Sequence, residues 1–294
     1  MTAEAELTIP VASPNADDSA PAEVPFVRIQ ASQGWVALGL REIWEHRELV
    51  YFLAWRDVAI RYKQTIFGAT WAIIQPLLQM VAFSVFFGQL AQIPSDGIPY
   101  PIFSYTALLP WNYFATALAK SSNSLVGQQN LINKVYFPRL ILPLASVLAP
   151  LLDFAIAFIV LLGMMVFYSI APTPAMAFVP LLVLVSVMCA LGTGLWLSAL
   201  NVDYRDVGYI VPFLTQIWMV ATPVAYPSSL LEDPWLTLYG LNPMVGVIEG
   251  FRWALLGTQP PPQLLIESVG ISVLLLLTGA LYYRRAERTF ADIA

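Results

Sequence analysis

The chain has 294 residues, of which 58% are hydrophobic and only 11% are charged, and its mean hydropathy is +0.69. Soluble domains carry about 25% charged and roughly 45–50% apolar residues, so this composition excludes a conventional soluble enzyme, a disordered protein and a disulfide-rich secreted domain. A single cysteine and a single histidine exclude an intramolecular disulfide and a cysteine- or histidine-rich metal site. We therefore expect an all-α integral membrane protein without a bound metal.

Residues 1–30 form an acidic segment with four prolines and almost no aromatic residue. Five of the 19 acidic residues lie here: Glu4, Glu6, Asp17, Asp18 and Glu23. Such a segment has too little apolar surface to offset the entropy of ordering, so we expect a disordered cytoplasmic tail. It lacks the basic and apolar regions of a signal peptide. The 14 acidic residues that follow balance the 14 basic ones, which predicts no nucleic-acid partner.

Residues 31–65 mix aromatic side chains with cations, most clearly between Trp35 and Lys63. This segment is too highly charged to cross a bilayer. The pattern is typical of an amphipathic helix that lies in the membrane interface, with its rings in the lipid and its cations near the phosphates. Two interpretations are open, a helix that only anchors the protein and a helix that acts as a gate.

Residues 66–285 contain six apolar runs that we predict to be transmembrane helices, because about 20 helical residues cross the hydrocarbon core. The runs are 67–90, 102–119, 141–169, 177–199, 208–225 and 264–283. The third run contains Pro143 and Pro150, which predict a kinked or partly interfacial start. Residues 286–294 are expected to form a short cytoplasmic tail.

The basic residues fix the orientation of these helices. Thirteen of the 14 lie in segments that six crossings place on one side, and Arg252 alone lies on the other. The positive-inside rule then puts both termini in the cytoplasm. Between the fifth and sixth runs, the apolar stretch 243–256 is too short to cross, which predicts a re-entrant or interfacial helical hairpin on the external side.

No known catalytic motif is present: the sequence contains neither a GxxxxGK[ST] phosphate loop nor an HExxH or GxSxG pattern. Asp153, in the third apolar run, is the clearest ionisable residue at membrane depth and is a functional candidate for that reason. The alternative is a protonated acid, or one bonded to a hydroxyl of a neighbouring helix. An intramembrane enzyme usually needs a second acid or base, so we expect no catalytic site.

The first and fifth runs carry amide and aromatic side chains instead. Those in question are Gln75, Gln79, Phe83 and Phe86 in the first run and Gln216, Trp218 and Tyr226 at the fifth. The four in the first run follow one helical face. Rings that stack on pyranoses and amides that exchange hydrogen bonds suit a conduit for sugar polymers, but the same amides could simply hold helices together.

The cytoplasmic segment 120–140 contains a predicted short helix over residues 125–137, which Pro138 ends. Its apolar side chains are Leu131, Ile132, Val135, Tyr136 and Phe137. An exposed helix of this kind either docks into a groove of a partner protein or lies flat on lipid.

Five stretches in order resemble one family. They are WRDVAIRYKQTIFGATWAIIQPLLQ (55–79), PYPIFSYTALLPWNYFATAL (99–118), LINKVYFPRLILP (131–143), NVDYRDV (201–207) and NPMVGVIEGFRWALLG (242–257). Together they resemble the type-2 ABC exporter permeases of lipid-linked polysaccharides such as O-antigen, capsule and teichoic acid. The resemblance covers about residues 50–285.

The resemblance implies a bacterial inner-membrane homodimer that binds two separate ATP-binding cassette subunits. These partners would hold ATP and magnesium, so no cofactor is expected in this chain. The substrate would be a lipid-linked polysaccharide, and membrane lipids would surround the dimer. The first and fifth helices, with the seven amide and aromatic residues named above, would line the channel.

The resemblance also assigns residues to the other parts. The gate helix would include Trp55, Arg56, Asp57, Arg61 and Tyr62, and the ATPase coupling helix would include Asn130, Leu131, Asn133, Lys134, Tyr136 and Phe137. In the external hairpin, Glu249 and Arg252 would pair. The sequence departs from many relatives at Leu140, where they carry an acid, and at Asn133, where they carry a base.

Two other functions fit the sequence. One is a type-2 exporter of drugs or lipids, which predicts a closed, lipid-filled dimer seam. The other is an intramembrane enzyme that acts on lipid-linked sugars, for which substitution of Asp153 would be the discriminating test.

Overall fold

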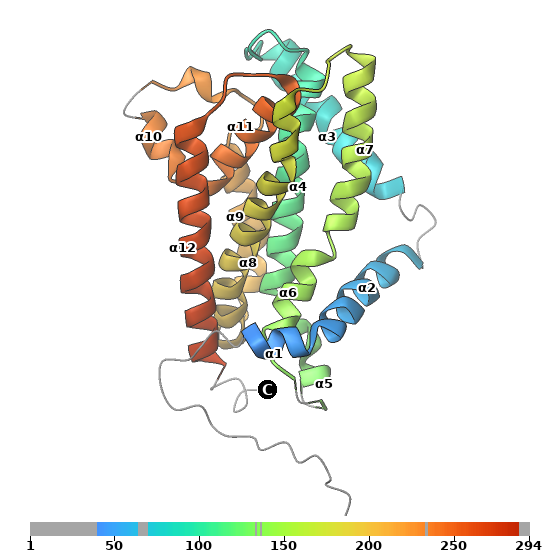
Figure 1. Ribbon diagram of the computed structural model, residues 1–294, viewed down its shortest axis with the longest axis vertical. Coiled ribbons are helices and arrows are strands. Elements are labelled where there is room, and N and C mark those ends of the chain that lie inside the picture. The colour runs from blue at the N-terminus through green and yellow to red at the C-terminus, as the bar shows by residue number, and fades with distance from the viewer. Residues whose placement is uncertain (1–39, 64–69, 133, 136, 233–234, 288–294) are drawn as a thin grey trace, which may run out of the picture. The chain divides into compact units, whose positions relative to one another are not determined.

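The computed structural model describes residues 40–63, 70–132, 134–135, 137–232 and 235–287, and within these ranges all regular structure is helical (Figure 1). The predicted acidic tail, residues 1–30, lies outside the described residues, as does the C-terminal tail after Glu287.

Two helices come first, α1 (Leu40–Glu45) and α2 (Arg47–Lys63). Val50 and Leu53 of α2 are buried in an apolar cluster that includes residues of α6 (Ile141–Leu148), whereas Tyr51, Phe52 and Trp55 are exposed. α2 therefore has apolar side chains on two faces, one for the protein and one for a surrounding apolar medium. The position of α2 in a membrane interface remains a prediction.

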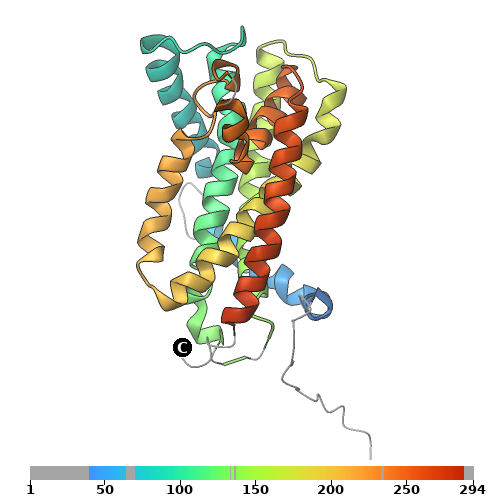
Figure 2. The same ribbon diagram turned by 90° about the vertical axis from the view of Figure 1, so that its left-hand side faces the viewer.

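The first predicted span is α3 (Thr70–Phe83), which continues as a π-helix, η1 (Ser84–Leu90). The second is α4 (Tyr100–Ser122), the helix at the centre of the bundle. α4 packs against α3 and α6 and against four later helices: α7 (Leu151–Phe167), α8 (Val179–Asp203), α9 (Val207–Val220) and α11 (Pro243–Leu256). Helices far apart in the sequence are thus held together by one central helix, as the two views show (Figures 1 and 2).

The third predicted span is two helices, α6 (Ile141–Leu148) and α7 (Leu151–Phe167). The break falls at Ala149 and Pro150, which confirms the predicted kink. Proline has no N–H to continue the helical hydrogen bonding, so α7 begins a new N-terminus directly after Pro150.

Two long helices of 25 residues each, α8 (Val179–Asp203) and α12 (Pro262–Ala286), pack against each other. A 3₁₀ turn at Pro174–Phe178 precedes α8. Two glycines allow the close approach. A Cβ on Gly279 would lie 2.3 Å from the carbonyl oxygen of Gly192, so no larger residue fits without separating the helices.

The fifth predicted span is α9 (Val207–Val220), followed by a 3₁₀ turn at Ser228–Leu230, α10 (Trp235–Gly240) and α11 (Pro243–Leu256). α11 is buried among α4, α8 and α12. It is therefore a helix of the protein interior, and whether it is re-entrant or interfacial is not decided by its packing. Its depth in a membrane remains a prediction.

Four segments of the described chain are long and apolar enough to cross a membrane: Thr70–Leu90, Ile141–Phe167, Pro174–Asp203 and Pro262–Ala286. α4 has sufficient length but its sequence is less apolar, because it packs against protein on most sides. α9 has 14 residues, or about 21 Å of helix, which is short for a span of about 30 Å. Six crossings per chain remain a prediction.

The predicted helix over residues 125–137 is wrong in extent. The structure has a 3₁₀ turn, η2 (Val126–Gln128), and a four-residue helix, α5 (Gln129–Ile132), followed by turns. Phe137 is buried in the apolar cluster that also holds Leu125 and residues of α2 and α8. Burying both ends of the segment in one cluster makes the chain turn between them, so a continuous helix does not form.

Candidate functional site

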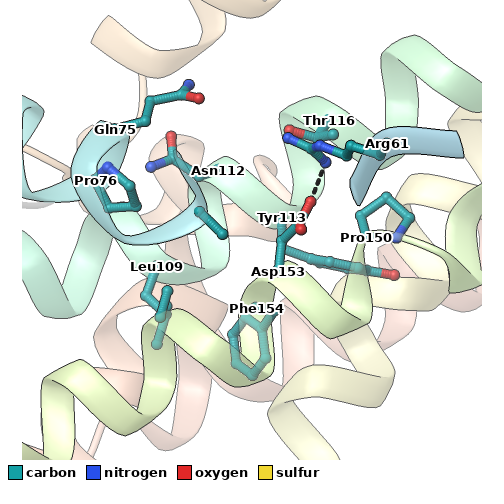
Figure 3. Close-up of a pocket in the computed structure, with 12 residues that line it drawn as sticks. Arg61, Gln75, Pro76, Leu109, Asn112, Tyr113, Thr116, Pro150, Asp153 and Phe154 are labelled. Carbon is teal, nitrogen blue, oxygen red and sulfur yellow. Dashed lines mark hydrogen bonds and ion pairs between the residues drawn. The ribbon is translucent and has the colours of Figure 1, made fainter. Parts of the chain in front are cut away.

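A polar cluster lies where the C-terminal end of α2 meets α3, α4 and α7. The Arg61 guanidinium forms an ion pair with the Asp153 carboxylate, and the Tyr62 hydroxyl donates a hydrogen bond to the other oxygen of that carboxylate. Arg61 and Asp153 face a small cavity of about 50 Å³ (Figure 3). The structure therefore joins two predicted gate residues to the predicted intramembrane acid.

Local structure explains why a carboxylate is stable here. Asp153 lies in the first turn of α7, the new helix that begins after Pro150. The unpaired N–H groups and the dipole of a helix N-terminus favour a negative charge. Burial and the neighbouring Asp153 raise the pKa of the Tyr62 hydroxyl well above its ordinary value, so this hydroxyl remains a donor at neutral pH. Of the two alternatives for Asp153, the hydroxyl partner is present, together with a cation.

Amides from α3 and α4 line the other side of the same cavity (Figure 3). Asn112 donates a hydrogen bond of 2.7 Å to the side-chain oxygen of Gln79, so this predicted channel residue ties α3 to α4. Gln75, one turn earlier, is exposed at the cavity. Sequence reasoning missed Asn112; a polar residue in an otherwise apolar run was the available signal.

The remaining predicted channel residues lie on α3, η1, α9 and the loop after α9. Phe83 is half-buried and packs edge-to-face on Phe87 with a centroid distance of 5.2 Å, whereas Phe86 and Gln216 are exposed. Tyr226 bonds through its hydroxyl to the hydroxyl of Tyr239 at 2.8 Å. The predicted channel residues are thus either exposed or half-buried, and their role in a channel remains a prediction.

Trp218 connects α9 to two other parts of the bundle. Its indole N–H donates to the Asn242 side-chain oxygen at 2.9 Å, and its ring packs edge-to-face on Phe114 of α4 at 4.9 Å. The same Asn242 oxygen caps α11 by accepting from the Met244 N–H at 3.1 Å, and the Asn242 amide donates to the Thr222 hydroxyl at 2.9 Å. Asn242, which sequence reasoning missed, therefore joins α9 to the start of α11.

The predicted Glu249–Arg252 pair forms, with 2.9 Å between a guanidinium nitrogen and a carboxylate oxygen. Arg252 is 1% exposed and lies 3.7 Å from the centre of the Phe103 ring. It also donates to the carbonyl oxygens of Val224 and Tyr226 at 3.2 and 3.3 Å. The pair therefore fastens the chain that leaves α9 onto α11.

The predicted coupling residues are divided between surface and interior. Asn130 and Lys134 are exposed, Leu131 is half-buried and Phe137 is buried. Asn133 and Tyr136 lie outside the described residues. The expected apolar docking face is thus smaller than the sequence pattern indicated, because part of it packs against this chain.

The loop after α5 is held by the C-terminal end of α12. The Tyr283 hydroxyl donates to the Arg139 carbonyl oxygen at 3.0 Å, and the Arg139 backbone N–H donates to the Glu287 carboxylate at 3.3 Å. Burial is the main cause that raises the pKa of Glu287, against the lowering effect of Arg284 and Arg139. The loop predicted to receive the partner therefore rests on α12.

The other predicted gate residues lie along α2. Trp55 is exposed, and Arg56 pairs with Asp57 at 2.9 Å. At the far ends of α4 and α8, Asn201 donates to the Ser122 carbonyl oxygen at 3.0 Å and accepts from the Gly208 N–H at 3.1 Å. The NVDYRDV motif thus contains a residue that joins α4, α8 and α9, a role its spacing did not indicate.

Comparison with known proteins places this arrangement in a family. The profile of the ABC-2 type transporter family matches residues 48–256. The O-antigen export system permease protein RfbA of Myxococcus xanthus is 28% identical over 257 residues, which cover 86% of this chain and 98% of that protein. Two RfbA permeases of Klebsiella pneumoniae are each 24% identical over 249 residues, which cover 84% of this chain and 95% of theirs.

The chain therefore belongs to the ABC-2 type transporter family, as its motifs indicated. The class is that of multi-pass membrane permeases, transport proteins rather than enzymes, whose ATP hydrolysis is carried out by a separate ATP-binding cassette subunit. Among the described residues, no group of three His, Cys, Asp or Glu side chains is arranged to hold a metal ion.

Proposed function

We propose that this chain is the permease of an exporter that moves a lipid-linked polysaccharide across the bacterial inner membrane. The observation that carries the proposal is the match to O-antigen export permeases over nearly their whole length. The polymer would be of the O-antigen, capsule or teichoic-acid kind.

The assembly in this proposal is a homodimer that binds two ATP-binding cassette subunits, with six crossings per chain and both termini in the cytoplasm. The exposed parts of α3 and α9 would face the polymer path. The short helix before Pro138 would contact the ATPase, and ATP and magnesium would bind there and not in this chain. Apolar side chains exposed on α9, such as Phe213 and Ile217, support a surface covered by lipid or by a second copy.

The polar cluster supplies a mechanism for gating. α2 is tied to α7 through Arg61 and Tyr62, whose common partner is Asp153. A shift of α2 must either break this contact or move Asp153 along with α2. Asp153 lies in the first turn of α7, the helix that follows the kink. Movement of the interface helix is thereby linked to the transmembrane bundle.

Purification of the tagged full chain in mild detergent, followed by intact-complex mass spectrometry, tests the assembly. We expect two copies of the chain with two ATP-binding subunits. ATP hydrolysis by this complex should rise on addition of the lipid-linked glycan. Stimulation by hydrophobic drugs or plain phospholipid, with none by the glycan, would instead support an exporter of drugs or lipids.

A further inference from the structure

Beside the polar cluster, on the side of α5, a cleft of about 420 Å³ lies between α2 and the end of α4. Most of its exposed wall is formed by carbon atoms, but seven of the residues that line it carry polar side chains: Asp57, Arg61, Lys120, Asn123, Ser124, Gln128 and Ser146. Arg61 also lines the smaller cavity that contains Asp153, so one guanidinium lies between the two spaces.

Lys120 is the cation of this cleft that has no carboxylate partner. Arg56 and Arg61 each form an ion pair, with Asp57 and Asp153, whereas Lys120 makes no hydrogen bond or ion pair with any described residue. Three cations and two carboxylates leave one positive charge. That charge lies at a half-buried position, where an unpaired ammonium group loses hydration and favours an anion.

The other wall residues suit an oxyanion. The hydroxyl of Ser146 and the amide group of Gln128 bring hydrogen-bond donors to the cleft. The Ser124 hydroxyl and the Asn123 amide already donate to the carbonyl oxygens of Ser121 and Ala119. A phosphate or diphosphate group matches a wall with the Lys120 ammonium and these two neutral donors.

The rim of the cleft indicates where the anion comes from. Ile60 lines the cleft and is 64% exposed, and Phe52, about two turns earlier on α2, is exposed as well. An anionic group in the cleft would thus have an apolar surface beside it, which suits the hydrocarbon of a lipid.

We propose that this cleft binds the phosphate or diphosphate headgroup of the lipid-linked substrate, with Lys120 as its main contact, and that the bound anion draws Arg61 away from Asp153. This inference rests on the proposed function and names the part of the substrate that is recognised at the entrance. The headgroup and Asp153 compete for one guanidinium. Binding therefore loosens α2 from α7.

Binding of undecaprenyl diphosphate to the full complex in nanodiscs, measured by native mass spectrometry, tests the site. We expect Lys120→Gln to weaken binding about ten- to hundredfold, the typical effect of losing one charge-assisted contact. Lys120→Arg should keep binding within a few fold, which also shows that the position tolerates substitution. Arg205→Gln, an exposed cation on the turn between α8 and α9, is the control with the same change of charge and should bind as the wild type does.

Two further ligands distinguish the source of the anion. Undecaprenol, which has no phosphate, should bind equally to the wild type and Lys120→Gln. Inorganic diphosphate that competes at the same concentration as the lipid would assign the site to a free anion and overturn the lipid assignment. Equal binding of undecaprenyl diphosphate to wild type and Lys120→Gln would overturn the site alone, whereas no binding to the wild type would contradict the proposed function as well.

The displacement of Arg61 has its own measurement. Spin labels at Glu48→Cys on α2 and Ile159→Cys on α7, both exposed positions, report the distance between these helices, and the native Cys189 is buried. We expect undecaprenyl diphosphate to lengthen this distance in the wild type. In Asp153→Asn the distance should be long without ligand. An unchanged distance in the wild type would overturn the competition for Arg61.

Discussion

A charged carboxylate at membrane depth requires compensation, and Asp153 receives it from three directions. The N-terminus of α7 favours the negative charge, Arg61 supplies a cation and Tyr62 supplies a hydroxyl. Arg61 and Tyr62 lie more than 90 positions earlier in the chain. Sequence reasoning found all three residues but could not join them, because it had no means to place the end of α2 beside the start of α7.

A double-mutant cycle at this site should show coupling. We expect Asp153→Asn and Arg61→Gln each to lower the free energy of unfolding by about 1–2 kcal/mol, since the pair is only partly buried and water screens part of it. The double variant should lose less than the sum of the two. Thermal unfolding in detergent measures this, with the exposed Asp203→Asn as a control that should stay within about 0.5 kcal/mol. Simple additivity would mean that the ion pair is not the source of the effect.

The Arg252 site should respond much more strongly. Removing the partner in Glu249→Ala leaves a fully buried guanidinium without a carboxylate, and we expect a loss of about 3–5 kcal/mol. Replacing both residues, in Glu249→Ala with Arg252→Met, should cost less than the sum because no unpaired charge remains. Fluorescence-detected gel filtration after heating reports the difference. A single variant as stable as the wild type would contradict the described pair.

At the scale of elements, glycine contacts determine how closely α8 and α12 pack. Gly279→Ala places a methyl group against the Gly192 carbonyl, so the helices must separate, and we expect a loss of about 1–3 kcal/mol in the free energy of unfolding.

Gly270→Ala is the matched control on the same helix. A Cβ at Gly270 meets no described atom within 4 Å, and alanine favours a helix over glycine by up to about 1 kcal/mol. The melting temperature should therefore fall for Gly279→Ala and stay or rise for Gly270→Ala. The opposite order would show that α8 and α12 do not pack through these glycines.

Hydrophobic runs and prolines predicted most helices of this fold. The runs at 177–199 and 264–283 correspond to α8 and α12, and Pro150 predicted the break before α7. The run at 125–137 did not become one helix, since its ends are drawn into a shared apolar cluster. Local patterns do not contain such tertiary contacts, which is why this element was wrong while the longer ones were right.

At the scale of the whole molecule, the proposed homodimer predicts a cross-link. Gln216 is exposed on α9, which the proposal places at the path between two copies. We expect Gln216→Cys to form a dimer band on a non-reducing gel after mild oxidation. Ile266→Cys, equally accessible on α12 at 73% exposure, should remain monomeric, and the buried Cys189 should not react. A dimer band for Ile266→Cys alone would place the interface on the opposite helix.

The class of the protein could be predicted from the sequence, because its composition indicated a membrane protein and its five ordered motifs resemble the family whose profile the chain matches. Lys120 was not singled out, since a lysine just after an apolar run is expected at any cytoplasmic helix end. Its importance depends on Arg56 and Arg61 already having partners. The unpaired charge of Lys120 can therefore be recognised only once the structure shows which cations and carboxylates pair.

The continuity of α12 has a mechanical consequence. One end of this 25-residue helix holds the loop after α5 through Tyr283, and the other end accepts α11, whose Gly246 N–H donates to Ser268 at 3.1 Å. An unbroken helix of this length is a stiff rod of about 37 Å. In the proposed assembly, a push on the loop by the ATPase would therefore be transmitted along α12 to α11 at its other end.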